Sequence, residues 1–105
     1  MVTLVVYIPE THLEEVKTAL FSKGAGRYEG YDCCSWQVAG EGQFRALEGS
    51  KPFIGEEGTI ERVREYRVEM ICVEELLAEV IAELKRAHPY EVPAFMVHKN
   101  MAVSG

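Results

Sequence analysis

The fold is decided by the stretch IERVREYRVEMICV at residues 60–73. Apolar residues recur there at every second position and share one face of an extended chain: Tyr66, Val68, Met70 and Cys72. Charged residues share the opposite face: Glu65, Arg67 and Glu69. A period of two residues with one apolar face is typical of an antiparallel strand that is buried on one side and open to water on the other.

Two amphipathic helices are predicted, one on each side of this strand along the chain. The first begins around residues 9–11 and ends at Gly24, which is suited to a left-handed helix stop. Its apolar stripe contains Leu13, Val16, Ala19 and Leu20. The second covers residues 74–87, and its stripe contains Leu77, Val80, Ile81 and Leu84. Because each helix has a single apolar face, both are expected to cover the same side of one sheet.

A central strand and a hairpin are predicted before residue 48. Residues 2–8 (VTLVVYI) are β-branched or apolar at nearly every position, which indicates a central strand covered on both faces. Residues 31–38 regain strand composition, and residues 43–47 are interpreted as their return strand. The glycines around Glu41 provide the turn signal between the two strands.

The remaining segments are a long loop, a short last strand and a tail. Residues 48–58 contain three glycines, a serine and a proline, which is typical of a loop. Pro89 and Pro93 end the second helical region, and residues 94–98 are predicted to form the last strand. Residues 100–105 are expected to be a loose tail.

The resulting order is β-α-β-β-β-α-β in a single domain, residues 1–105. This order predicts an α+β fold of ferredoxin-like type, with an antiparallel sheet, two helices on one face and an extra β-hairpin. A doubly wound parallel sheet needs a helix between successive strands. Residues 31–73 have no helical period, so that alternative is rejected.

Charge and cysteine content limit the classes of function. The 17 acidic and 11 basic residues give a net charge of −6, which argues against sequence-independent nucleic-acid binding because such binding depends on neutralising phosphates. The three cysteines are an odd number, so we expect reduced thiols in a cytoplasmic protein. Of the adjacent Cys33 and Cys34, one is expected in the core and one near the surface. The apolar residues 1–8 are too short for a membrane span and lack the basic flank of a signal peptide.

Four short motifs carry a family resemblance. They are GAGRY at residues 24–28, GEGQF at 40–44, GSKPFIG at 49–55 and HPYEVP at 88–93. In this order and spacing they resemble the motifs of CutA proteins and of YqfO-type domains, and the likeness extends from the first strand to Val97. The sequence thus looks like a free-standing copy of the CutA/PII-like module that YqfO-type proteins carry.

The resemblance implies a PII/CutA-like fold and a homo-oligomer, with a trimer favoured. In YqfO-type proteins the module is inserted between the halves of a larger metal-binding domain of the Nif-three-like family, and those halves hold the metal ligands. They are absent from this sequence, so the resemblance implies no GTP cyclohydrolase activity here. Phe95-Met96 stands where tyrosine and aspartate are usual, which removes an acidic side chain from the last strand.

The candidate ligand-binding residues form two groups. Aromatic residues, an arginine and a neighbouring thiol make up the first group: Tyr31, Cys33, Trp36, Phe44 and Arg45. The alternative for these aromatic residues is packing in the core and between subunits. The second group is His88 and Glu91, which are candidate ligands for a divalent ion. The alternative for His88 is a structural cation at the end of the second helix, where it stabilises the helix dipole.

Two further segments have a functional and a simple structural interpretation. The loop at residues 49–58 is a candidate regulatory loop, because long loops commonly contact ligands or partners. Glutamates alternate with arginines from residue 56 to residue 69. This pattern favours a solvated, ion-paired strand face over a pair of catalytic carboxylates.

We assign no catalytic residue and no metal site, because no nucleophile–base pair or metal-ligand set stands out. The first hypothesis is a non-enzymatic PII/CutA-like oligomer that binds or senses a small ligand or a divalent cation between its subunits; any cofactor stays unknown. The alternative is a protein–protein interaction or oligomerisation module without a ligand. In both, the hairpin and the last strand are predicted sheet edges that pair between subunits, and neither nucleic acid nor membrane is a partner.

Overall fold

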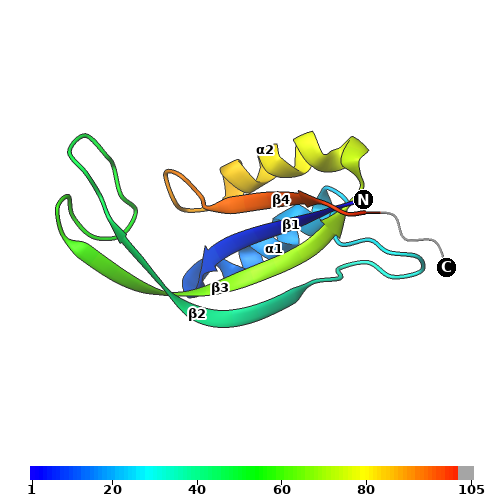
Figure 1. The fold of residues 1–105 in the computed structure, drawn as a ribbon, viewed down its shortest axis with the longest axis horizontal. Helices are drawn as coiled ribbons and strands as arrows, with labels where there is room; N and C mark the ends of the chain where they lie inside the picture. The colour runs from blue at the N-terminus through cyan, green and yellow to red at the C-terminus, as the bar shows by residue number, and fades with distance from the viewer. Residues whose placement is uncertain (102–105) are drawn as a thin grey trace.

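The computed structural model describes residues 1–101, which form one four-stranded antiparallel sheet and two helices (Figure 1). The strands are β1 (Val2–Pro9), β2 (Trp36–Arg45), β3 (Ile60–Cys72) and β4 (Phe95–Lys99). The helices are α1 (Leu13–Ser22) and α2 (Leu77–Ala87), and a 3-10 turn precedes each of them, at Glu10–His12 and Glu74–Leu76. The strand order is β2-β3-β1-β4, and every neighbouring pair is antiparallel. The α+β ferredoxin-like fold is therefore confirmed.

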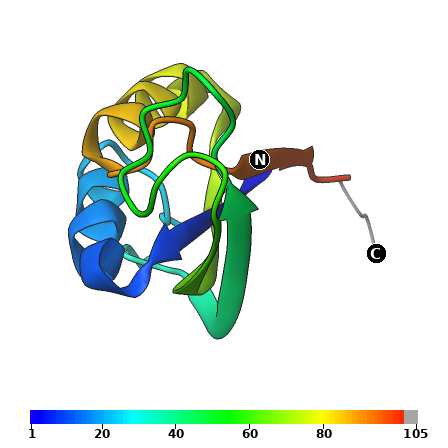
Figure 2. The same cartoon turned by 90° about the vertical axis from the view of Figure 1, so that its left-hand side faces the viewer.

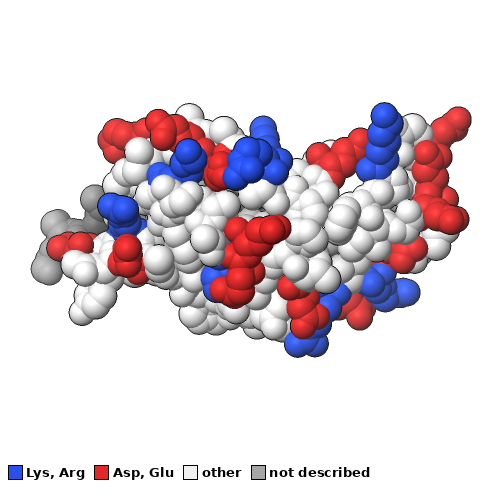
Figure 3. All heavy atoms as spheres, turned by 180° about the vertical axis from the view of Figure 1, so that it is seen from behind, with Lys and Arg blue, Asp and Glu red and all other residues white. Residues whose placement is uncertain are grey.

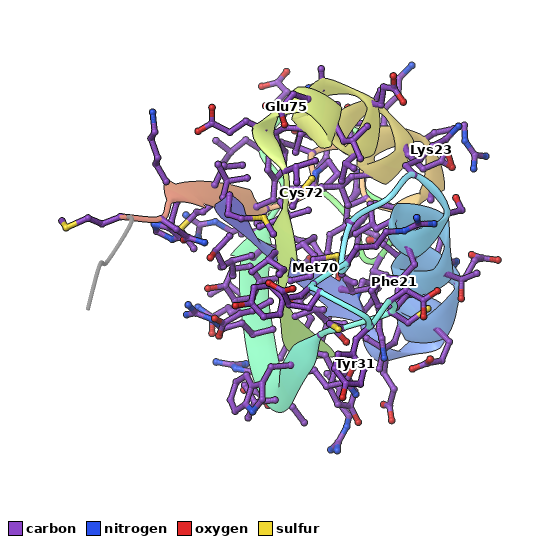
Figure 4. All side chains as sticks on the ribbon, turned by 90° about the vertical axis from the view of Figure 1, so that its right-hand side faces the viewer. Phe21, Lys23, Tyr31, Met70, Cys72 and Glu75 are labelled. Carbon is purple, nitrogen blue, oxygen red and sulfur yellow. The ribbon has the colours of Figure 1, made fainter. Side chains whose placement is uncertain are left out.

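The core lies between the sheet and the two helices, which cover the same face of the sheet (Figure 2). Its buried side chains come from β1, β3 and both helices: Val2, Leu4, Val6, Ile8, Leu13, Val16, Leu20, Val68, Met70, Cys72, Val80 and Leu84. Each such side chain contributes roughly 1.5–3 kcal/mol by leaving water. In Figure 4, Met70 and Cys72 lie on the helix-facing side of β3, which confirms the alternation predicted for this strand.

Gly24 ends α1, as the sequence predicts. Its φ is +99°, a conformation that side-chain-bearing residues rarely adopt. A Cβ at this position would also come within 2.6 Å of the Leu76 side chain. The chain then turns back to the sheet, where the Gly26 amide donates to the carbonyl of Ile71 at 2.8 Å. The loop after α1 is thus attached to the end of β3.

The predicted extra hairpin around Glu41 is wrong. β2 runs without interruption through Gly40 and Gly42, and it pairs with β3 along its whole length, from Trp36 to Arg45. Neither glycine has a positive φ. Gly42 instead leaves space for the carboxylate of Glu65, which a Cβ at this position would overlap. The hairpin that exists is β2–β3 itself, closed by a loop at residues 46–59.

The predicted strand start at Tyr31 is also wrong, because residues 27–35 form a loop. Tyr28 and Tyr31 exchange two backbone hydrogen bonds, of 3.0 and 2.9 Å, which close the chain on itself. Glu29 lies between them with a φ of 51°, and Cys33 has a φ of 55°. These left-handed residues interrupt any extended strand, so pairing with β3 begins only at Trp36.

The two edge strands of the sheet are β2 and β4, as the sequence predicts. The predicted loose tail is wrong at its first residue: the Asn100 amide donates to the Met1 carbonyl at 3.2 Å, and Thr3 donates to the Asn100 side chain at 2.8 Å. The rest of that prediction, residues 102–105, lies outside the described residues. Across residues 1–101, neither helix has the length and apolar character needed to cross a membrane.

Candidate functional site

A cavity of about 280 Å³ lies at the end of the molecule where β2 and β3 project beyond β1. The last ladder pair of β1 joins Pro9 to Glu65, whereas β2 and β3 stay paired as far as Arg45 and Ile60. The loop at residues 46–59 folds back towards the segment that follows α2 (Figures 1 and 2). These segments enclose the cavity, whose lining is Gln43, Phe44, Ala46, Ser50, Pro52, Phe53, Ile54, Glu65, Tyr90, Glu91, Val92 and Ala94.

Three contacts hold the loop against the body of the domain. The Lys51 amide donates to the carboxylate of Glu91 at 3.3 Å. The ring of Phe53 meets that of Tyr90 with centroids 6.4 Å apart, and it meets His12 edge-on at 5.4 Å. Aromatic pairs of this geometry contribute about 0.5–1.5 kcal/mol each beyond the area they bury. The loop therefore forms one wall of the cavity.

A hydrogen-bonded chain crosses from the cavity to the sheet. The Tyr90 hydroxyl donates to Glu65 Oε2 at 2.7 Å, and the Tyr90 amide donates to His88 Nδ1 at 3.1 Å. Because Nδ1 accepts a proton, we assign the ring proton to Nε2, which then donates to the Tyr7 carbonyl at 2.7 Å. Both ring nitrogens of His88 are thus engaged, and the side chain is almost fully buried.

The surroundings determine the protonation of His88 and Tyr90. Burial lowers the pKa of His88, so the ring is neutral near pH 7. The predicted cation at the end of the second helix is therefore wrong, and His88 acts as a neutral link instead. Burial, followed by the hydrogen bond to Glu65, raises the pKa of Tyr90. Tyr90 consequently keeps its proton and donates a hydrogen bond to Glu65 Oε2.

The charge around the cavity is negative. Its lining contains the carboxylates of Glu65 and Glu91 but neither lysine nor arginine. Two arginines of β3 pair with glutamates elsewhere, Arg62 with Glu41 at 3.8 Å and Arg64 with Glu10 at 3.4 Å. The ion-paired strand face is thus confirmed for these arginines. It is wrong for Glu65, which accepts a hydrogen bond from the Tyr90 hydroxyl.

The structure separates the predicted aromatic group into two places. Phe44 lines the cavity, whereas Trp36 lies at the other end of β2, eight residues or roughly 26 Å away along an extended strand. Trp36 is 60% exposed beside a second, open hollow of about 500 Å³. That hollow is lined by Thr3, Tyr28, Cys34, Ser35, Trp36, Glu69, Met70 and Ile71. The core interpretation of Trp36 is wrong, because most of its surface is in contact with solvent.

The other predicted residues lie apart from both hollows or at the edge of the cavity. Tyr31 is 74% exposed and points away from the core (Figure 4). Cys33 and Arg45 are also exposed, and neither lines the two hollows. Glu91 lies in the cavity wall, and His88 lies behind it, with its ring 4.8 Å from that of Tyr90. The structure therefore brings together Phe44, Glu91 and, indirectly, His88.

Sequence reasoning missed three residues of the cavity. Tyr90 lies inside the HPYEVP motif but was not singled out, and Glu65 was placed on a solvated face. Phe53 had a visible signal: the apolar run Pro52-Phe53-Ile54 interrupts an otherwise polar, glycine-rich loop. Apolar residues in such a loop indicate that part of it packs against the domain.

The thiols and potential metal ligands give no further site. Cys72 is buried, which raises the pKa of its thiol, whereas Cys33 is exposed and Cys34 is half-buried. The predicted distribution for the pair Cys33 and Cys34, one in the core and one near the surface, is wrong, because neither is fully buried and the core thiol is Cys72. Within residues 1–101, no three His, Cys, Asp or Glu side chains gather closely enough to hold a metal ion.

Known proteins with similar sequences are longer than this chain. The GTP cyclohydrolase 1 type 2 homolog of Mycobacterium tuberculosis is 50% identical over 91 residues, which is 87% of this chain and 24% of that protein. The chain thus spans about a quarter of the length of the curated relatives it matches. No family model matches the sequence.

Solved structures with a similar fold include a NIF3-related protein and CutA1. A Bacillus cereus protein related to NIF3 superposes with a TM-score of 0.79 at 39% identity, covering 92% of this chain and 24% of that protein. CutA1 from Pyrococcus horikoshii superposes with a TM-score of 0.70 at 21% identity, covering 99% of this chain and 87% of CutA1. The second likeness concerns the fold alone. The chain is therefore a NIF3-type domain with the fold of CutA1, and it matches about a quarter of the length of these longer proteins.

Proposed function

We propose that this chain is a non-enzymatic, oligomeric PII/CutA-like module that binds a small ligand in the cavity at the β2–β3 end. The observation that carries the proposal is the cavity itself, which combines mostly apolar walls with a few polar groups that converge on it. Ligand sites in proteins commonly have this composition. The long loop at residues 46–59 forms one wall, so ligand binding and loop position are coupled in this proposal.

A small organic ligand fits the cavity better than a divalent ion. Hard divalent cations take six or more oxygen ligands, whereas two carboxylates and otherwise mostly apolar side chains line this cavity. The last strand, where the family pattern has an acidic residue, carries Phe95 and Met96 instead. Of the two ligand classes expected from the sequence, a small ligand or a divalent cation, these features favour a small organic ligand.

Binding without catalysis is favoured by the chemistry of the lining. His88, which lies behind the cavity wall, is neutral and buried, with both nitrogens engaged. Neither a cysteine nor a lysine lines the cavity, and the hydroxyl of Tyr90 is held as a donor to Glu65. Because neither histidine nor cysteine lines the cavity, the serine–histidine and cysteine–histidine pairs of covalent catalysis are not part of this lining, in which Ser50 is the remaining hydroxyl.

A specific observation also favours self-association, the basis of the second candidate function. The open face and edges of the sheet expose large apolar side chains, among them Trp36, Val38 and Met96. Burying such residues between copies of the chain would remove apolar surface from water and cover the free edges of β2 and β4. We propose a trimer in which these surfaces meet; without a ligand, it would be an oligomerisation module alone.

The oligomer is tested by light scattering coupled to size-exclusion chromatography. The wild type is expected at the trimer mass, and Trp36→Glu is expected to shift the mass towards the monomer. Tyr31→Glu is the matched control, because Tyr31 is more exposed than Trp36 and lies in the loop before β2. A wild-type monomer at micromolar concentration would contradict the proposal.

Ligand binding is tested by thermal shift with a panel of amines, carboxylic acids, nucleotides and divalent ions. A compound that binds the folded state raises Tm with increasing concentration. The shift is expected to shrink in Phe53→Ala, which removes a wall of the cavity, and to persist in Leu47→Ala, whose side chain is 67% exposed in the same loop. If no compound in the panel raises Tm, the module without a ligand becomes the better account.

A further inference from the structure

We infer that the cavity selects a small organic amine, whose ammonium group pairs with Glu65 and Glu91 and whose apolar body packs against the aromatic wall. This inference rests on the proposed function and names the chemical class of its ligand. It is carried by three features of the same cavity: the sign of the charge in its lining, the free acceptor capacity of Glu65, and the rings that surround them.

The lining can accept a positive charge but has no group to neutralise a negative one. Glu65 and Glu91 are its charged residues, and no lysine or arginine accompanies them. Lys51 lies in the loop beside the cavity, yet its contact with Glu91 is made by the backbone amide, and its side chain is exposed. An anionic ligand would therefore meet like charge, whereas an ammonium group would meet opposite charge.

Glu65 is held in position with acceptor capacity to spare. An ionised carboxylate offers about four acceptor positions, and the Tyr90 hydroxyl occupies one of them. Its position is further defined by Gly42, which leaves room for the carboxylate against the backbone of β2. A carboxylate fixed in this way loses little side-chain entropy when it pairs with a ligand.

The aromatic residues favour a cation with an apolar body. Phe44 and Phe53 each lie close to Tyr90, with ring centroids 6.2 and 6.4 Å away, and all three rings line the cavity. The faces of aromatic rings attract cations, and their surfaces also pack against apolar groups. A bare metal ion has no apolar body to pack against the rings, whereas an alkyl- or arylamine would use both properties.

The surroundings strengthen the same preference. The loop at residues 46–59 contains Glu48, Glu56 and Glu57 but a single basic residue, Lys51. Acidic side chains gather at this end of the molecule in Figure 3, and the whole chain has a net charge of −6. Such a field concentrates cations near the cavity and repels phosphates and carboxylates.

The test uses three probes that share a benzyl or phenyl body and differ in charge: benzylamine, benzyl alcohol and benzoate. Binding to the full chain is measured by isothermal titration calorimetry near pH 7.5, where benzylamine is protonated. Benzylamine is expected to bind at least about tenfold more tightly than benzyl alcohol, and benzoate is expected to bind more weakly still.

Three glutamate variants locate the ammonium group. Glu65→Gln is expected to weaken benzylamine binding by about tenfold or more, and the exposed Glu91→Gln by about two- to fivefold. Glu79→Gln is the matched control, because it removes the same charge from an exposed position on α2. Amide NMR spectra establish that each variant is folded.

The outcomes separate this inference from the proposed function. If benzyl alcohol or benzoate binds as tightly as benzylamine, or if Glu65→Gln has no effect, the amine inference is overturned and the ligand site remains. The same holds if none of the three probes binds but another compound of the wider panel does. If nothing binds at all, both proposals fail together.

Discussion

The two halves of β3 belong to one continuous strand but differ in sequence and in surroundings: the positions in phase with Val68 and Met70 carry Arg62 and Arg64 in the first half. In the second half, Val68, Met70 and Cys72 are buried beneath the helices. In the first half, residues 60–65, no residue is fully buried, and beyond the last residue of β1 the strand pairs with β2 alone. One regular strand thus builds the core at one end and a wall of the cavity at the other.

This difference separates stability from binding. The helix-covered end contains the core side chains, whereas the projecting end depends on a few ring contacts and hydrogen bonds. Regions with few buried apolar contacts open at lower free energy than the core, and binding loops are commonly found in such regions. Changes at the two ends are therefore expected to affect different properties of the molecule.

The largest expected effect is a loss of stability at the helix-covered end. Leu84→Ala removes a fully buried side chain of α2 from the core and is expected to lower the free energy of unfolding by about 2–5 kcal/mol. The same truncation at Leu47, in the exposed loop, is expected to change it by less than about 0.5 kcal/mol. Urea denaturation of both variants is the measurement. Equal losses would contradict the division between the two ends.

A smaller effect is expected from His88, which joins the two ends. The unfolded ring takes up a proton below about pH 6.5, whereas the folded ring has a lowered pKa and stays neutral longer. Stability should therefore fall as the pH drops below about 6.5, by up to about 1.4 kcal/mol per pH unit until the folded pKa is reached.

The variant His88→Gln isolates this contribution, because glutamine retains a donor for the Tyr7 carbonyl but does not titrate. Urea denaturation at pH 7.5, 6.5 and 5.5 is expected to show a shallower decline for the variant than for the wild type. Identical pH slopes would show that His88 does not link protonation to folding.

The smallest effect on stability, with a clear effect on the cavity, is expected from a pair of glycines in β2. Gly42→Ala displaces the carboxylate of Glu65, a flexible side chain, so the free energy of unfolding should change by less than about 1 kcal/mol while benzylamine binding weakens severalfold. At Gly40 an added Cβ would have no neighbour within 4 Å, so Gly40→Ala should alter neither. Denaturation and calorimetry are compared for both variants, and equal benzylamine affinity in the two would argue against a role for Glu65.

The helix-covered end could be predicted from the sequence because local patterns determine it. The apolar stripes of α1 and α2 and the alternation in β3 each identify a buried face without any knowledge of distant contacts. The two errors, the hairpin turn around Glu41 and the strand start at Tyr31, arose where the residue type does not determine the backbone conformation. Gly40 and Gly42 are turn formers by type, yet here they lie in a strand, and a tertiary contact with Glu65 explains the second of them.

The cavity was predicted less completely because it depends on contacts between distant segments. Phe44 and Trp36 look like one aromatic group in the sequence, but an extended strand places them at opposite ends of the domain. Glu65 has arginine neighbours in sequence, whereas its hydrogen-bond partner, Tyr90, lies 25 residues further along the chain. Partners of this kind become visible only once the chain is folded.

The division between a packed end and a binding end is tested most directly by hydrogen exchange of the full chain with and without benzylamine. Without the probe, β1 and α2 should exchange slowly and the loop at residues 46–59 quickly. With saturating benzylamine, new protection should be confined to residues 43–54 and 88–94, which enclose the cavity. Protection that appears instead around Trp36, or none in either segment, would contradict the account.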